Sequence, residues 1–193
     1  MVWLLFVGNI TIDWANEVLR KHKKFVILDT ETTGLGNRDE IIELALLSPN
    51  GDVLHNERFM PSCSIGKEAT KIHGITKKDL KDCSTITGTG ALIKKAIGKR
   101  QIIAYNAKFD ARLYAQSVKN TNNGYAPVGE WFCAMEIYSQ FVGEINPQTG
   151  THKWQKLQGG DHTALGDCEA TLSIIKTMAS AQKLKKWWQF WIA

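Results

Sequence analysis

Apolar runs along the chain predict four strands of a sheet. The run that begins at Phe25 ends in Asp29, a pattern typical of a buried central strand. Asn50-Gly51 separates the next two runs and favours a tight hairpin turn, so we expect the sheet to begin antiparallel. The predicted strands are residues 25–30, 41–47, 53–60 and 101–105.

Between and after these runs, the mixture of polar and apolar residues predicts helices. The last and longest begins near Thr163, and Leu165, Cys168, Leu172 and Ile175 recur there at three- and four-residue spacing, which gives one buried apolar face. The other predicted helices are residues 11–24, 77–81, 90–97, 107–118 and 132–142. Strands followed by alternating helices and strands indicate an α/β fold, a mixed sheet with helices on its faces.

The bulk composition narrows the class of protein. A chain of 193 residues with 44% hydrophobic and 22% charged residues suits a single globular domain, residues 1–193. We divide it into an N-terminal apolar segment and helix (1–24), a core (25–179) and a basic, aromatic tail (180–193). The net charge of +5 slightly favours a polyanionic partner such as nucleic acid.

Compartment and redox state are also constrained by the sequence. The apolar N-terminal run is shorter than the roughly 20 residues needed to span a bilayer, and it lacks a basic start and a cleavage site. The four cysteines are scattered, without metal-ligand spacing. We therefore expect a cytoplasmic protein with free thiols and no membrane partner.

Two acidic residues end the first predicted strand. Side chains two apart on a strand point the same way, so Asp29 and Glu31 can reach one centre. Burying such a carboxylate pair is costly unless cations neutralise it, and hard oxygen ligands select Mg²⁺ or Mn²⁺ over zinc. Turn or cap chemistry at the strand end is the simpler alternative for Asp29.

Three further residues complete a candidate site. Asp110 falls in the first turn of a predicted helix, where an acidic residue can instead merely stabilise the helix N-terminus. His162 and Asp167 are five residues apart, which on a helix would leave them about 140° apart. We therefore place His162 on a loop and Asp167 in the first helical turn, with Thr163 as the cap. A surface histidine before a helix-start aspartate is the alternative.

Read together, these segments resemble the DEDDh family of 3′→5′ exonucleases, the group of the DNA polymerase III proofreading subunit. The resemblance runs from about Phe25 to Met178. Its order and spacing carry more weight than any single piece. The matching segments are residues 26–35, 72–76, 105–110 and 162–167.

The resemblance implies an RNase H-like fold: a mixed five-stranded sheet, its first three strands antiparallel, flanked by helices on both faces. It also implies two divalent cations, Mg²⁺ or Mn²⁺, held by Asp29, Glu31, Asp110 and Asp167, with His162 as the general base. The expected reaction releases nucleoside 5′-monophosphates from single-stranded 3′ ends of DNA, with RNA left open. The four carboxylates and His162 are the predicted catalytic residues.

The resemblance further implies contacts to the terminal nucleotide. Thr32, Thr33 and Leu35 should line its pocket, with Leu35 wedged against the last base. His73 and Asn106 should contact its sugar or phosphate; for His73, a loop histidine without a role is the alternative. A non-catalytic nucleic-acid-binding or assembly subunit of a polymerase or CRISPR adaptation complex is the alternative function.

Two segments depart from the family pattern. The connection before His162 is short and contains Gly159-Gly160, so we expect His162 to be mobile until metal and nucleotide bind. The tail carries aromatic residues that could stack bases, meet a protein partner or lie at a membrane surface. We favour a tail folded back on the core, because an exposed aromatic patch invites aggregation. The residues that it would contact are Trp3, Leu4 and Phe6.

Overall fold

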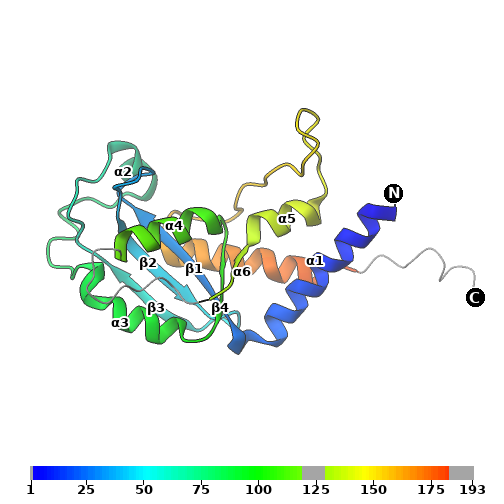
Figure 1. The fold of residues 1–193 in the computed structure, drawn as a ribbon, viewed down its shortest axis with the longest axis horizontal. Helices are drawn as coiled ribbons and strands as arrows, with labels where there is room; N and C mark the ends of the chain where they lie inside the picture. Colours follow the sequence, from blue (N-terminus) through cyan, green and yellow to red (C-terminus); the bar gives the residue numbers. More distant parts are fainter. Residues whose placement is uncertain (1, 119–128, 183–193) are drawn as a thin grey trace, which may run out of the picture.

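A computed structural model describes residues 2–118 and 129–182 of the chain, and in it five strands form one mixed sheet in the order β3-β2-β1-β4-β5 (Figure 1). The strands are β1 (Phe25–Thr32), β2 (Ile41–Leu47), β3 (Val53–Arg58), β4 (Gln101–Ala104) and β5 (Trp131–Cys133). β1 to β3 pair antiparallel, whereas β4 is parallel to β1 and β5 is parallel to β4. The predicted mixed sheet is confirmed.

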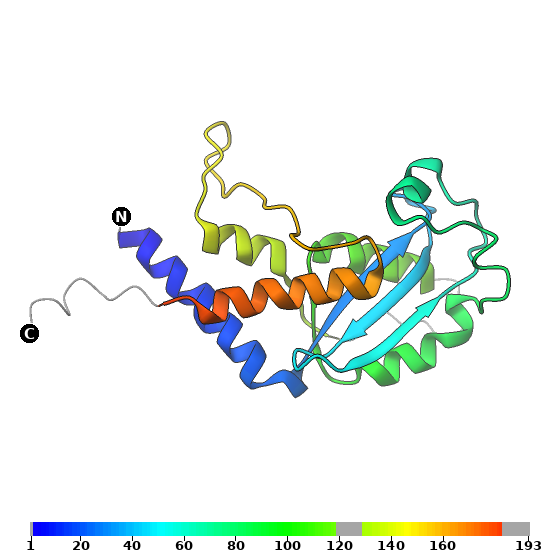
Figure 2. The same cartoon turned by 180° about the vertical axis from the view of Figure 1, so that it is seen from behind.

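Helices cover both faces of this sheet. α1, α5 and α6 lie on one face, and α3 and α4 lie on the other (Figures 1 and 2). The helices are α1 (Val2–Arg20), α2 (Lys67–His73), α3 (Ile86–Ile97), α4 (Ala107–Val118), α5 (Ala134–Val142) and α6 (Ala164–Ser180), with a 3₁₀ turn η1 (His22–Lys24) before β1. Within the described part of the chain, no helix is apolar over the length that a membrane crossing needs.

Alternation along β1 separates two hydrophobic cores and directs the polar residues at its end. Ile27 packs into the core beneath α1, α5 and α6, whereas Leu28 packs into the core beneath α3 and α4. Because side chains alternate across a strand, Asp29 and Glu31 share the side of Ile27, and Thr30 shares the side of Leu28. The end of β1 therefore presents polar groups toward both layers of helices.

Several predicted elements were wrong in type or extent. The first helix begins at Val2 rather than Thr11, so it includes the N-terminal apolar run. Residues 77–81 form a turn instead of a helix, and the helix Lys67–His73 was not predicted. The segment assigned wholly to a helix, residues 132–142, starts inside β5 and becomes helical only at Ala134.

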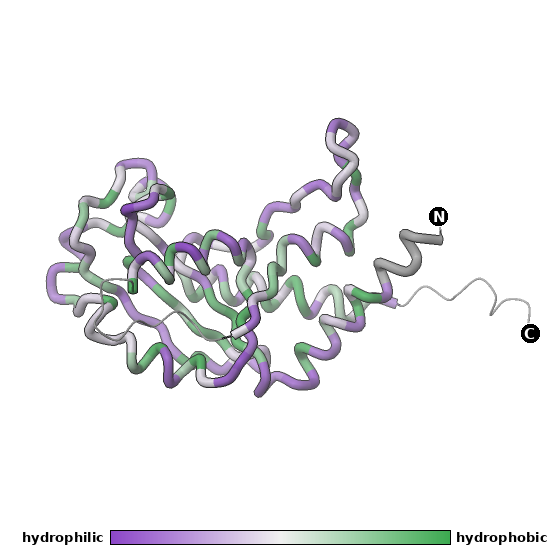
Figure 3. Tube along the Cα trace, in the orientation of Figure 1, coloured by the Kyte–Doolittle hydropathy of each residue, from purple (hydrophilic) through white to green (hydrophobic). Residues whose placement is uncertain are grey.

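A polar arm leaves the body after α5. Residues 143–160, called the hairpin arm below, project from the end of α5 and return to the start of α6 (Figures 1 and 2). The arm is largely hydrophilic, while the central strands are largely hydrophobic (Figure 3). The aromatic tail and the side chains of Trp3, Leu4 and Phe6 lie outside the described residues, so the predicted packing of the tail stays a prediction.

Candidate active site

The five residues predicted to be catalytic line one cavity of about 560 Å³. It opens where the ends of β1 and β4 meet the first turns of α4 and α6. β1 supplies two of them, and α4, α6 and the preceding loop supply the rest. The five are Asp29, Glu31, Asp110, His162 and Asp167.

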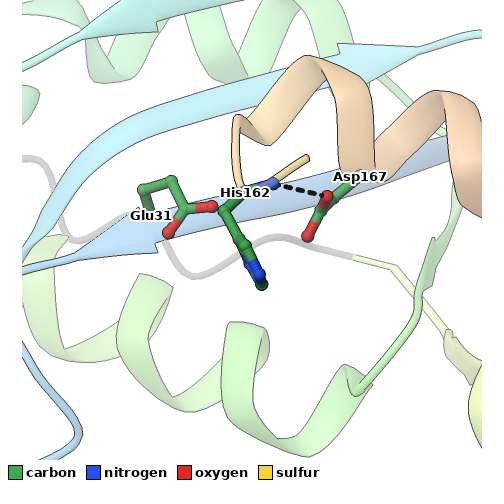
Figure 4. Close-up of side chains that lie close together, drawn as sticks. All are labelled: Glu31, His162 and Asp167. Carbon is green, nitrogen blue, oxygen red and sulfur yellow. Dashed lines mark hydrogen bonds between the residues drawn. The ribbon is translucent and has the colours of Figure 1, made fainter. Parts of the chain in front are cut away.

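Three of these side chains form a cluster that could hold a metal ion. One ligand atom each from Glu31, His162 and Asp167 lies within 4.8 Å of the other two (Figure 4). His162 precedes α6 and Asp167 lies in its first turn, as predicted from their spacing. Thr163 is the N-cap, and its hydroxyl accepts a hydrogen bond of 3.0 Å from the backbone N–H of Gly166.

Asp167 also shapes the loop that carries the histidine. Its Oδ1 accepts hydrogen bonds from the backbone N–H groups of Asp161 at 3.1 Å and His162 at 3.2 Å (Figure 4). His162 has a φ of 60°, a left-handed conformation that a non-glycine residue rarely adopts. The histidine and the aspartate are therefore held by one turn, with the imidazole exposed beside Glu31.

Asp110 is the most deeply buried carboxylate of the site. It is 3% exposed, and its Oδ1 accepts a hydrogen bond of 2.8 Å from the hydroxyl of Thr30. Thr30 lies between the two acidic residues of β1, so this bond ties α4 to that strand. Sequence reasoning missed Thr30, because nothing in a lone strand threonine signals a carboxylate partner 80 residues away.

The electrostatics of the site favour cations. Burial, with the nearby charges of Asp110 and Asp167, holds the pKa of Asp29 well above its usual value. Burial and the other carboxylates raise the pKa of Glu31 to about 8, and burial raises that of Asp110 to about 7. The pKa of Asp167 is also raised, chiefly by burial. A set of carboxylates that resist ionising together is the donor set that hard divalent cations neutralise, so these residues fit a metal site.

Glu43 supports the site from β2 and was also missed. It is 6% exposed, its Oε1 accepts a hydrogen bond of 2.7 Å from Arg58 Nε, and its Oε2 accepts one of 2.9 Å from the backbone N–H of Ala164. The carboxylate thus joins β2 and β3 to the start of α6. A single acidic residue inside the otherwise apolar strand Ile41–Leu47 was the signal that could have found it.

A second cavity, of about 380 Å³, adjoins the first and shares Thr30, Glu31 and Phe109 with it. Of the residues predicted to contact the nucleotide, Thr32, Leu35 and His73 line this cavity, and Leu35 is 78% exposed. Asn106 lines the first cavity instead. The walls of the second cavity are completed by Gly34, Gly66, Lys67, Glu68, Ala69 and Ile72.

Thr33 and His73 are engaged with the protein itself. Thr33 lines neither cavity, and its hydroxyl donates to Asp39 Oδ1 at 2.8 Å. His73 Nδ1 accepts from the backbone N–H of Ile75 at 3.0 Å, which leaves Nε2–H to donate to the Thr32 carbonyl at 3.2 Å. Both ring nitrogens of His73 are therefore used by backbone groups.

Known proteins are similar to this chain over most of its length. Residues 26–175 match the RNase_T exonuclease family model. The chain belongs to this exonuclease family. It is a DnaQ-like exonuclease of the RNase H-like superfamily. It is 34% identical over 170 residues to the uncharacterized exonuclease CP81 of Escherichia phage 186, a match that covers 80% of this chain and 87% of the phage protein.

Similarity extends to larger enzymes and to solved structures. The PolC-type DNA polymerase III of Staphylococcus aureus is 28% identical over 175 residues, which cover 86% of this chain but 12% of the polymerase. The structure of Exonuclease X in complex with 5′ overhanging duplex DNA is 26% identical, with a TM-score of 0.56 over 82% of this chain and 95% of Exonuclease X. Apo Exonuclease I, at 20% identity, shares the fold with a TM-score of 0.64 over 82% of this chain and 42% of its own.

Proposed function

We propose that this exonuclease degrades single-stranded DNA from its 3′ end and releases nucleoside 5′-monophosphates. The observation that carries the proposal is the convergence of Asp29, Glu31, Asp110, His162 and Asp167 on one cavity. The direction follows from the DEDDh resemblance of the same residues. DNA as substrate is supported by the complexes of the similar structures, Exonuclease X with duplex DNA and E. coli Exonuclease I with an oligonucleotide.

Asp29, Glu31 and Asp167 would hold one divalent cation. Asp29 would also reach a second cation, and Asp110 would complete the shell. Two such ions, Mg²⁺ or Mn²⁺, would stabilise negative charge on the attacking and leaving oxygens of an in-line displacement. The raised pKa values of Asp29 and Glu31 support this assignment, because bound cations would offset the burial and the mutual repulsion that raise these values.

His162 would act as the general base. In the hydrolysis, a water oxygen bonds to the phosphorus of the terminal phosphodiester while the bond from phosphorus to the 3′-oxygen of the preceding nucleotide breaks. The imidazole would take the proton of the attacking water and pass it to solvent, to which the side chain is exposed. The leaving 3′-oxygen takes up a proton, and the nucleotide departs as a 5′-monophosphate.

The second cavity would bind the terminal nucleoside. Leu35, Ile72 and Phe109 offer apolar contact area to a base. Thr32 lines the same cavity next to Glu31 in the sequence. Asn106, in the first cavity, would contact the sugar or phosphate. His73 would contribute the flat face of its ring, because its nitrogens already bond to the backbone.

The test uses matched 5′-labelled and 3′-labelled DNA and RNA oligonucleotides with Mg²⁺, Mn²⁺ or EDTA. Stepwise shortening of the 5′-labelled strand with release of 5′-monophosphates, lost in EDTA and in Asp29→Asn, is expected. His162→Gln should lower kcat by about 10²–10⁴-fold, while His152→Gln on the hairpin arm should not. Cleavage that persists in EDTA would contradict the proposal. Binding of DNA without any cleavage would favour the non-catalytic alternative.

A further inference from the structure

Backbone hydrogen bonds hold the two sides of the hairpin arm together. Ile145 pairs with His152 in an antiparallel bridge. The backbone N–H of Asn146 donates to the Thr151 carbonyl at 2.8 Å, and that of Lys153 donates to Glu144 at the same distance. These bonds support the shape seen in Figures 1 and 2, where the arm stands away from α5.

The returning side of the arm leads into the catalytic cavity. Residues 155–160 all line that cavity. The hydroxyl of Tyr105 donates to the Gln155 carbonyl at 2.7 Å, and Leu157 packs against the core beneath α6. Residues 155–160 are therefore fixed to the rest of the fold beside the site, and the exposed part of the arm continues outward from them.

Along this returning side, exposed and covered residues alternate. Trp154, Lys156 and Gln158 are exposed, whereas Gln155 and Leu157 are partly covered. Trp154 is 69% exposed, an unusual position for so large an apolar surface unless a partner covers it. Residues two apart are separated by at most about 6.6 Å of chain, so the exposed residues Trp154, Lys156 and Gln158, called the row below, follow one another closely up to the cavity, which Lys156 and Gln158 line.

The chemistry of the row matches one kind of occupant. An indole can stack on any base, and a lysine pairs with phosphate without regard to sequence. Lys156 makes no ion pair among the described residues and itself lines the catalytic cavity, so its charge is available there. Aromatic and cationic groups leading to the site of hydrolysis are the composition of a single-strand track.

We propose that Trp154 and Lys156 bind the substrate strand upstream of its terminal nucleotide, with Trp154 stacking on a base and Lys156 contacting a phosphate. The occupant is single-stranded nucleic acid that continues into the catalytic cavity. The inference rests on the proposed function, since it concerns the same substrate. It adds a binding surface beyond the pocket for the terminal nucleotide.

Two kinds of substrate distinguish the contribution of the row from that of the catalytic centre. The p-nitrophenyl ester of thymidine 5′-monophosphate reaches only the centre, whereas oligonucleotides of two to twelve residues also reach the arm. Trp154→Ala should raise KM for the longer oligonucleotides roughly 5- to 150-fold, the equivalent of the 1–3 kcal/mol of one stacked base, and leave ester hydrolysis unchanged. Trp154→Phe should restore most of the loss. Leu92→Ala removes another exposed apolar side chain, on α3, and should change neither reaction.

Binding gives an independent readout. With Asp29→Asn as background and EDTA present, Lys156→Ala should lower the slope of log Kd against log salt by about 0.7, one phosphate contact on a single strand. Equal losses on the ester and the oligonucleotides, or no loss on either, would overturn the proposed track. Absence of cleavage of both substrates by the unmodified chain would count against the proposed function instead, and the binding measurement would still test the row.

Discussion

The Glu43 carboxylate on β2 accepts a hydrogen bond of 2.9 Å from the backbone N–H of Ala164, the first residue of α6, although 121 positions separate them. A negative charge at a helix N-terminus is also favoured by the helix dipole. The turn next to this bond carries His162 and Asp167. Glu43 is therefore a positioning residue, which fixes the start of α6 against the strand that pairs with β1.

Replacing Glu43 with glutamine should weaken both folding and catalysis. The carboxylate accepts from Arg58 at one oxygen and from Ala164 at the other, and an amide would place an NH₂ donor at one of these two positions. We expect the free energy of unfolding to fall by about 1–3 kcal/mol and kcat to fall more than KM rises. Denaturant unfolding and steady-state kinetics at a temperature where the variant is folded measure these effects.

The matched control is Arg58→Gln, which removes one donor but leaves the bond from Ala164 to Glu43 in place. Its stability should also fall, because the Glu43 carboxylate loses a partner while buried. Its kcat should stay closer to that of the unmodified chain. Equal kcat values for the two variants would show that the bond to α6 has no special effect on catalysis.

The raised pKa of Glu31 predicts that, without metal, this residue destabilises the folded chain increasingly as the pH rises. Its ordinary value is 4.5 and its value in the folded chain is about 8. Between these values the unfolded chain releases a proton that the folded chain retains, so raising the pH favours unfolding. In EDTA, Glu31→Gln should therefore have the higher Tm, by an amount that is negligible near pH 4.5 and grows toward pH 8.

Metal provides the control for this prediction. With saturating Mn²⁺ at pH 8, the unmodified chain should gain Tm by ligand binding, whereas Glu31→Gln should gain less because a ligand is lost. Each kcal/mol is expected to appear as about 2–4 °C in a chain of this size. A Tm difference in EDTA that does not change between pH 4.5 and pH 8 would contradict the assignment of the cost to Glu31.

The fold could be predicted where one pattern covers one element. β2 and α4 have the predicted bounds, since an apolar run interrupted only by Glu43 fills the strand and a helical stretch fills the helix from end to end. β5 has three residues and runs into the apolar start of α5, so no change of pattern marks the boundary. α2 has no buried residue, and periodicity therefore gave no signal for it.

The site shows the same division. The residues with their own chemistry, such as Asp29 and His162, stand out in short motifs and line one cavity. The bonds that hold them, from Thr30 to Asp110 and from Ala164 to Glu43, join residues that only the sheet and helix packing bring together. Such partners depend on tertiary register, which local spacing does not encode.

The bond from Thr30 to Asp110 gives a prediction with a conservative rescue. Thr30→Val keeps the shape of the side chain but removes the hydroxyl that donates to the buried Asp110 carboxylate, so we expect a loss of about 1–3 kcal/mol in stability and weaker Mn²⁺ binding. Thr30→Ser keeps the hydroxyl and should retain most of both. Unfolding curves and Mn²⁺ titrations give the comparison, and identical behaviour of the two variants would dismiss a role for the bond.

Gly160 makes a close approach to Asp167 that a larger residue cannot share. A Cβ at this position would lie 2.6 Å from Asp167 Oδ1, the oxygen that also accepts from the backbone of Asp161 and His162. Gly160→Ala should therefore displace the aspartate or the histidine loop. Because misplacement by about 1 Å can cost on the order of 10²-fold in rate, we expect kcat to fall at least about tenfold with little change in Tm.

Gly90 provides the control, which shows whether any glycine-to-alanine substitution lowers kcat or only the one at Gly160. A Cβ at Gly90, inside α3, meets no atom within 4 Å. Gly90→Ala should leave kcat unchanged and raise the Tm, since alanine stabilises a helix interior by about 0.5–1 kcal/mol relative to glycine. Full activity of Gly160→Ala beside an active Gly90→Ala would mean that the turn between Gly160 and Asp167 tolerates the added methyl group, and that the tight geometry around Oδ1 is not needed for catalysis.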